Sequence, residues 1–178
     1  MTTTLEQEKT MDFSEAPVLE ETGEKETKRK VAIICSKGSL DMAYPGLIMA
    51  NAARMMGIDA MIFFTFWGLD IVTKKKAGHL HAGMLGNPSS PMPHSLMGIP
   101  GMEALATKMM KKKIEDLDIP DIPELLETLE DAGAELYSCQ LAMEMFDLED
   151  SDLVPQVTSS LTAMDFWEKA DGAQVVFI

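Results

Sequence analysis

The two cysteines are the residues of this chain best suited to chemistry. Cys35 closes the apolar run "KVAIIC", Cys139 closes "AELYSC", and a helix-like segment follows each. A cysteine thiolate is a strong nucleophile, and the partial positive charge of a helix N-terminus favours that charged form. A cysteine at a strand end is nevertheless more often a small buried residue. Position alone therefore leaves open a buried hydrophobe, half of a disulfide, a metal ligand or a nucleophile.

The charges around Cys139 oppose a thiolate. From Ile114 to Glu168 the chain has 16 acidic residues and no Lys or Arg. Nearby carboxylates disfavour another negative charge. We therefore expect a basic group from elsewhere to assist Cys139, and the candidates are a lysine of a neighbouring subunit, His79, His81 and His94.

The other motifs are weaker. The turn "SKGS" after Cys35 could bind an anion through its backbone amides, with Lys37 beside it, but it lacks the spacing of a P-loop. The histidines and cysteines offer ligand types for zinc without the close spacing of a structural site. The chain also has no GxSxG motif. The sequence thus predicts neither a metal nor a cofactor.

The elements that position the cysteines alternate between strand and helix. Apolar periodicity and turn residues predict strands over 30–35, 58–68 and 134–139, helices over 40–57, 69–78, 101–117, 121–133 and 140–148, and a last helix and strand within 161–178. In 40–57 we expect Leu47, Ile48, Ala52 and Met55 to share one face. This alternation predicts an α/β fold: a three-layer α/β/α domain with a mainly parallel sheet of four or five strands and flavodoxin-like layering. Ligand sites in such folds lie at the carboxyl ends of the strands, so we expect both cysteines at one edge.

Length and composition predict one domain with a tail. Residues 1–29 hold eight acidic and four basic residues with little apolar periodicity, which predicts an acidic flexible tail before a domain over 30–178. The segment 78–101 is rich in Gly, Pro and Met and is too long for an ordinary connector, so we expect a functional loop there.

Charge and cysteine content restrict partners and compartment. The net charge of -14 disfavours nucleic acids and anionic lipid surfaces. Two cysteines and no secretory signal predict a reducing, cytoplasmic setting. The apolar stretch "AMIFFTFWGLDIV" is too short to span a bilayer, so membrane association is possible but not favoured.

Three motifs in order resemble the DsrE/DsrF-like superfamily, and within it the subgroup often labelled peroxiredoxin-like. They are "KVAIICSKGSLDMAYPGLIMANAARMMGIDAMIFFTFWGL", the Met- and Pro-rich loop, and "GAELYSCQLAMEMF", so the likeness runs from Lys30 to Ile178. It implies an α/β/α fold, a homo-oligomer, and sulfur trafficking in the cytoplasm with TusA-like and rhodanese-like carrier proteins. The chain has no peroxiredoxin active-site motif, so we expect no peroxidase activity.

The resemblance also implies roles for both cysteines. Cys139 in "YSCQ" matches the cysteine that accepts sulfane sulfur in DsrE-type carriers, which implies a sulfur carrier or sulfurtransferase working through a Cys139 persulfide. Cys35 matches a cysteine found after the first strand. It would hold a second sulfur, resolve the persulfide as a disulfide, or be structural. The alternatives are a non-catalytic oligomeric scaffold or membrane-associated protein that uses the Met-rich loop, and a flavodoxin-like ligand-binding module that uses the turn after Cys35.

Overall fold

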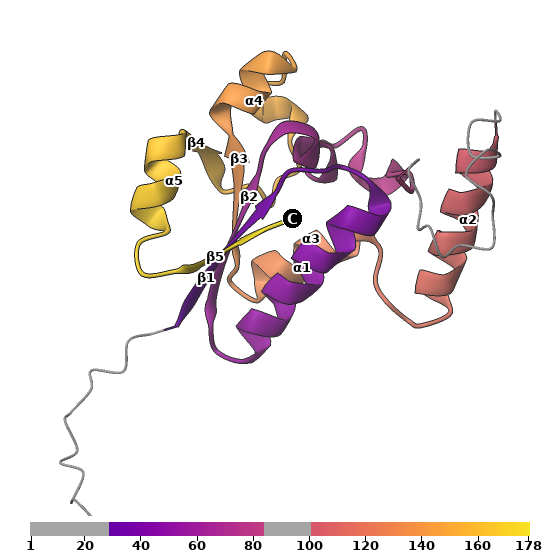
Figure 1. Ribbon diagram of the computed structural model, residues 1–178, viewed down its shortest axis with the longest axis horizontal. Coiled ribbons are helices and arrows are strands. Elements are labelled where there is room, and N and C mark those ends of the chain that lie inside the picture. Colours follow the sequence, from indigo (N-terminus) through magenta and orange to yellow (C-terminus); the bar gives the residue numbers. More distant parts are fainter. Residues whose placement is uncertain (1–28, 84–100) are drawn as a thin grey trace, which may run out of the picture.

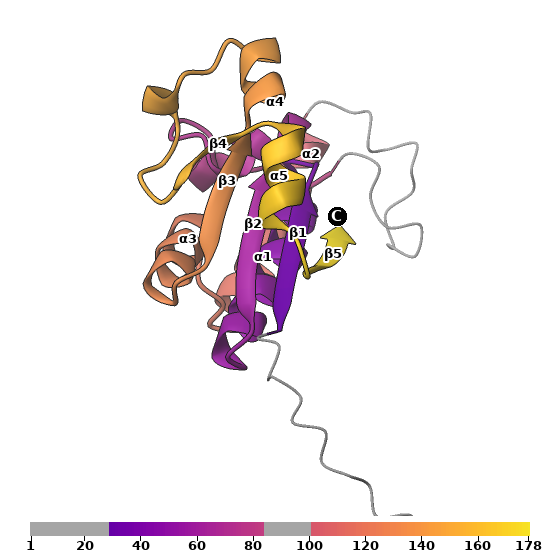
Figure 2. The same ribbon diagram turned by 90° about the vertical axis from the view of Figure 1, so that its left-hand side faces the viewer.

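The chain folds around a five-stranded parallel sheet with the strand order β4-β3-β2-β1-β5 (Figures 1 and 2). The computed structural model describes residues 29–83 and 101–178. Residues 1–28 of the predicted tail and residues 84–100 of the predicted loop lie outside the described residues. The predicted α/β class with a parallel sheet is confirmed.

The strands and helices follow one another in the predicted alternation. The strands are β1 (Lys30–Cys35), β2 (Asp59–Phe64), β3 (Glu135–Cys139), β4 (Ser159–Leu161) and β5 (Gln174–Phe177). The α-helices are α1 (Leu40–Met55), α2 (Met102–Glu115), α3 (Ile122–Asp131), α4 (Gln140–Met145) and α5 (Ala163–Lys169). Short 3-10 helices are η1 (Phe66–Ile71), η2 (Ala77–His79) and η4 (Asp150–Asp152).

Helices cover the sheet on both faces. Figure 1 shows α1 and α3 on one side of the sheet and α5 on the other. The Phe166 ring of α5 rests on the Phe63 ring of β2, with centroids 4.9 Å apart. Strands β1 to β4 follow one another across the sheet in one direction, and the connection through α5 to β5 runs in the opposite direction. Because crossovers between parallel strands are right-handed, this reversal places α5 on the other face of the sheet.

Two predicted boundaries near β2 are wrong. The strand predicted over 58–68 ends at Phe64. In place of the helix predicted over 69–78, the chain has the end of η1, a turn and the start of η2. The backbone turns at Phe66, whose φ of 48° lies in the left-handed region that non-glycine residues seldom adopt. Gly68 then passes directly over the end of β1, since a Cβ on it would lie 2.0 Å from the Cys35 carbonyl oxygen. β4 was not predicted, because its three residues, "SSL", form no apolar run.

The side of α1 that packs on the sheet is not the one that carries the largest apolar residues. Leu47 is buried, but Ile48 and Met55 are 44% and 81% exposed. Small residues dominate the face against the sheet, which consists of Leu40, Ala43, Gly46, Leu47, Ala50 and Ala53. Gly46 shows why: a Cβ there would lie 2.6 Å from Cys35 Sγ, so the helix packs too close to β1 for a larger side chain.

We expect the substitution Gly68→Ala to destabilise the protein by about 2 kcal/mol, because the new methyl group overlaps backbone atoms that cannot move aside cheaply. Urea unfolding followed by circular dichroism measures this change. Gly78→Ala is the matched control, since the nearest atom to a Cβ there is Pro123 Cγ at 3.9 Å. Equal free energies of unfolding for the two variants would contradict the packing described.

Candidate functional site

The sheet register places both cysteines at the carboxyl edge but on opposite faces. Cys35 pairs with Phe64, and Phe64 pairs with Ser138, so these three residues share one row across β1, β2 and β3. Cys139 follows Ser138 by one residue. Because side chains alternate between the faces of a sheet, Cys139 points away from the face that holds Cys35. The fold therefore brings the two cysteines to one edge without pairing them, and both are free thiols.

Cys35 is sealed inside the protein. Its side chain is 1% exposed and lies beneath α1 at Gly46. Burial raises the pKa of the Cys35 thiol from 9.0 to about 12, because the charged form loses its hydration. At neutral pH Cys35 is therefore a neutral thiol without access to a substrate.

Cys139 lies closer to solvent, at the junction of β3 and α4. It is the last residue of β3 and the N-cap of α4, with extended backbone angles and 9% exposure. No side chain caps α4, so the amides of its first turn keep their capacity to donate. The helix has only six residues, so its dipole is small and only the amides of its first turn can act on a group at its N-terminus.

A polar network that the sequence analysis missed fixes the strand next to Cys139. The hydroxyls of Ser138 and Ser160 lie 2.9 Å apart, and Ser160 donates to the Asp150 carboxylate at 2.9 Å. Ser160 Oγ also lies 3.2 Å from Met143 Sδ in α4. The network ties β3, β4, α4 and η4 together around the residue before Cys139. Nothing in the sequence distinguished these serines from surface ones.

The fold places Lys74 against the acidic segment that follows Cys139. Lys74 donates from its Nζ to the Ser151 carbonyl at 2.8 Å and from its backbone nitrogen to the Asp152 carbonyl at 2.9 Å. Of the three candidate histidines, His79 is the last residue of η2, and His81 Nδ1 lies 3.0 Å from the Glu103 carboxylate in α2. His94 lies outside the described residues. Lys74 was not among the predicted bases, since 77 residues separate it from Ser151.

Exposed apolar side chains lie on the two elements that follow β2 and β3 at this edge of the sheet. We call five of them the apolar patch: Phe66, Trp67, Leu141, Met145 and Phe146, which are 38% to 67% exposed. They come from η1 and from α4 with the residue after it, two elements in contact with each other. Acidic residues of the same region, Glu144, Asp147, Glu149 and Asp150, are also exposed. Cys139 is thus followed directly by a segment whose exposed side chains are apolar and acidic.

The turn after Cys35 packs against other parts of the chain. Ser36 donates from its backbone nitrogen and from its hydroxyl to the Ile178 carbonyl, both at 2.9 Å. A Cβ on Gly38 would lie 2.2 Å from the Trp67 carbonyl oxygen. This turn therefore packs against η1 and against Ile178, the residue after β5.

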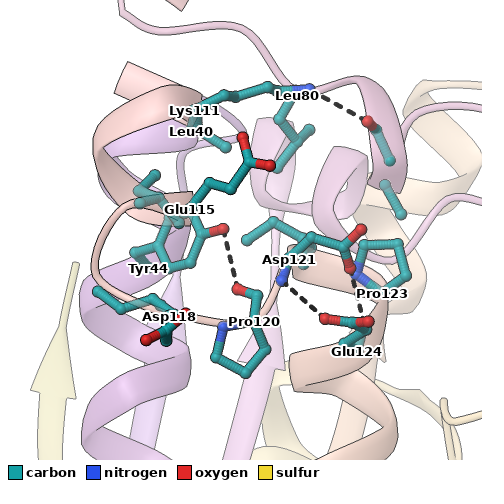
Figure 3. A pocket seen from close by; sticks show the side chains of 15 residues that line it. Leu40, Tyr44, Leu80, Lys111, Glu115, Asp118, Pro120, Asp121, Pro123 and Glu124 are labelled. Carbon is teal, nitrogen blue, oxygen red and sulfur yellow. Dashed lines mark hydrogen bonds between the residues drawn. The ribbon is translucent and has the colours of Figure 1, made fainter. Parts of the chain in front are cut away.

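A cavity of about 530 Å³ lies apart from both cysteines (Figure 3). It opens between α1, η2, the C-terminal half of α2 and the segment before α3, and neither cysteine lines it. Across residues 29–83 and 101–178, no three His, Cys, Asp or Glu side chains are grouped so that they could hold a metal ion.

Comparison with known proteins identifies the family. The profile of the DsrE/DsrF/DrsH-like family matches residues 27–178, so the chain belongs to this family. It is 36% identical over 138 residues to the "Sulfur carrier protein DsrE2" of Allochromatium vinosum, a match that covers 73% of this chain and 86% of that protein. It is 25% identical over 158 residues to the uncharacterized protein YrkE of Bacillus subtilis, covering 86% of this chain and 99% of that one.

A solved structure shares the fold. The crystal structure of the ychN protein from E. coli superposes with a TM-score of 0.50 at 15% identity, over 84% of this chain and 99% of that one. In the part of the chain that the structure describes, no helix is both long and apolar enough to cross a membrane.

We expect Cys139 to be alkylated by iodoacetamide at least about ten-fold faster than Cys35 at pH 8, because Cys35 is more deeply buried and holds its proton. Intact mass spectrometry of Cys35→Ser reports Cys139, and that of Cys139→Ser reports Cys35. Unfolding in guanidinium is the control and should remove the difference. A Cys35 thiol as reactive as Cys139 in the folded protein would contradict the burial.

The raised pKa of Cys35 also predicts a loss of stability in alkali. Unfolded chains release this proton near pH 9 and the folded protein only near pH 12, so the stabilisation is complete below pH 9 and is lost as the pH rises toward 12. The difference in free energy of unfolding between the parent and Cys35→Ala should therefore shift by about 1 kcal/mol against the parent between pH 8 and pH 10. Urea unfolding at both pH values measures it, and a pH-independent difference would refute the assignment.

Proposed function

We propose that this protein is a sulfur carrier that transfers sulfane sulfur through a persulfide on Cys139. The observation that carries the proposal is the position of Cys139, the less buried of the two thiols, at the carboxyl end of β3 beside an exposed surface. Membership of the DsrE/DsrF/DrsH-like family and the 36% identity to a protein named as a sulfur carrier support it.

In the loading step the Cys139 thiolate attacks the outer sulfur of a donor persulfide, R–S–SH. A new S–S bond forms at Cys139, the donor S–S bond breaks, and the donor leaves as the thiolate RS⁻. A thiosulfonate donor would leave as its sulfinate. In the unloading step an acceptor thiolate attacks the outer sulfur of Cys139–S–SH, and Cys139 regains its thiolate. The two steps balance without an external oxidant or reductant, because one sulfur atom moves between thiols.

Of the three roles open to Cys35, the geometry favours a structural one. Burial under α1 and a pKa of about 12 oppose a second persulfide. A disulfide with Cys139 would have to cross the sheet, since the two side chains leave it on opposite faces. We therefore assign the transfer chemistry to Cys139 alone.

The apolar patch supports docking of partner proteins at Cys139. A partner must bring its own thiol or persulfide to within bonding distance of a side chain that is only 9% exposed. Exposed aromatic and aliphatic side chains suit such a contact, and the acidic residues around them suit a partner with basic residues at its rim. Small TusA-like and rhodanese-like sulfur carriers are the partners we propose.

The outer helices support a homo-oligomer. Apolar side chains are exposed along α1 and α2, namely Ile48, Met49, Met55, Leu105 and Met109. A helix as little buried as α2 gains stability when another surface covers it. We propose that copies of this chain associate there, in the cytoplasm, where Cys139 stays reduced between transfers.

Incubation with glutathione persulfide should add one sulfur atom to the parent and to Cys35→Ser, and none to Cys139→Ser, as measured by intact mass. The reason is that only Cys139 combines a thiol with access to the donor. Dithiothreitol should remove the added mass, which distinguishes a persulfide from irreversible oxidation. If Cys139→Ser gains sulfur as readily as the parent, Cys139 is not the carrier. If neither the parent nor the variants gain sulfur, a scaffold role becomes the better account.

A further inference from the structure

The cavity of about 530 Å³ has the size of a small-molecule site, for which roughly 300 to 1,000 Å³ is usual. It exists because α2 stands off from the body of the domain: Thr107 is the only residue of this helix that is buried. Below the C-terminal half of α2, the chain from Asp118 to Glu124 and the start of α1 form the opposite wall.

The floor of the cavity is apolar. Leu40, Leu80 and Ile122 line it and are 2% to 4% exposed. Ile114 and Ile119 line it from the α2 side and are partly buried. A ligand that covered these side chains would remove apolar surface from water, which is the main source of affinity in such sites.

The mouth of the cavity is negatively charged. Four carboxylates line it, those of Glu115, Asp118, Asp121 and Glu124, against the single ammonium of Lys111. Lys111 donates to the Gly78 carbonyl at 3.2 Å, which holds its charge at one side. In the view of Figure 3 the Glu115 carboxylate lies between the Lys111 side chain and the Tyr44 ring.

The hydrogen bonds of the wall explain why an anion does not fit here. The N-terminus of α3 faces the cavity, and such an end attracts anions. Here Asp121 accepts from the Glu124 backbone nitrogen at 3.0 Å, and Glu124 accepts from the Asp121 backbone nitrogen at 3.3 Å. This capping box occupies the helix end with carboxylates, so the local charge favours a cation.

Tyr44 also lies in the negative electrostatic potential of these carboxylates. Its hydroxyl donates to the Pro120 carbonyl at 3.1 Å. The pKa of Tyr44 is raised, first by burial and then by the negative charges of Asp121 and Glu124. A potential that disfavours a phenolate favours a cation, and the tyrosine ring offers such a cation an aromatic face.

From the apolar floor and the acidic mouth we infer that this cavity binds a small organic cation, an ammonium group attached to an apolar body. The apolar part lies on Leu40, Leu80 and Ile122, and the ammonium pairs with Glu115 and Asp118. This site is separate from Cys139 and does not depend on the sulfur-carrier proposal.

Three probes of similar size and different charge test the inference: 2-phenylethylammonium, 2-phenylethanol and 3-phenylpropionate. Two-dimensional NMR of the full chain follows their binding. We expect the ammonium to bind about three- to five-fold tighter than the alcohol, the value of one or two partly exposed ion pairs, and the carboxylate to bind weakest. The shifted amides should lie in α1, α2 and the 118–124 segment. Equal binding of the three probes, no binding, or shifts elsewhere would overturn the inference.

Substitutions separate this site from general acidity and from the sulfur site. The double variant E115Q/D118N should lose the preference for the ammonium. The control E127Q/E130Q removes the same charge from exposed positions of α3 outside the cavity and should keep it. Cys139→Ser should bind the ammonium like the parent, so the outcome is independent of sulfur loading. A preference that survives in E115Q/D118N would refute the assigned ion pairs.

Discussion

The close approach of backbone segments around the end of β1 is the constraint on which the rest of the structure depends. Gly68 of η1 lies over the Cys35 carbonyl, Gly38 lies against the Trp67 carbonyl, and Gly46 of α1 lies against the Cys35 thiol. Each of these glycines would place a Cβ within 2.6 Å of a neighbouring atom, a distance that real side chains do not adopt. The packing seals Cys35 into the core. It also turns the chain after β2 so that Phe66 and Trp67 stand exposed beside α4.

Because of this packing, the two cysteines differ in burial, although both follow a strand-like run in the sequence. Helix α1 buries Cys35, and this burial raises the pKa of its thiol. Cys139 lies at the junction of β3 and α4. Reactivity of a thiol depends on access and on stabilisation of the thiolate, and only Cys139 has the first. The acidic residues that follow Cys139 are exposed, and Lys74 is held among them by its hydrogen bond to the Ser151 carbonyl. A partner that docks here would meet this acidic border with basic residues.

Much of the fold could be predicted from the sequence, because strands buried on both faces and amphipathic helices leave clear periodic patterns. "KVAIIC", "AELYSC" and the capped helix from Ile122 to Asp131 were found on that basis. Long-range pairing was not predictable. β4 is too short to show a pattern, and the bond network from Ser138 through Ser160 to Asp150 depends on the β3–β4 register. That Cys35 and Cys139 face opposite sides of the sheet follows from register as well, and no local pattern specifies it.

The central claim is that Cys139 receives and releases sulfur. The most direct test loads the Cys35→Ser variant with persulfide carrying isotopically labelled outer sulfur, locates the label by tandem mass spectrometry of the peptide that contains Cys139, and then adds an acceptor thiol. The account predicts that the label lies on Cys139 before the acceptor is added and on the acceptor afterwards, with the Cys139 thiol restored. A label that never reaches Cys139, or that stays there in the presence of the acceptor, would contradict it.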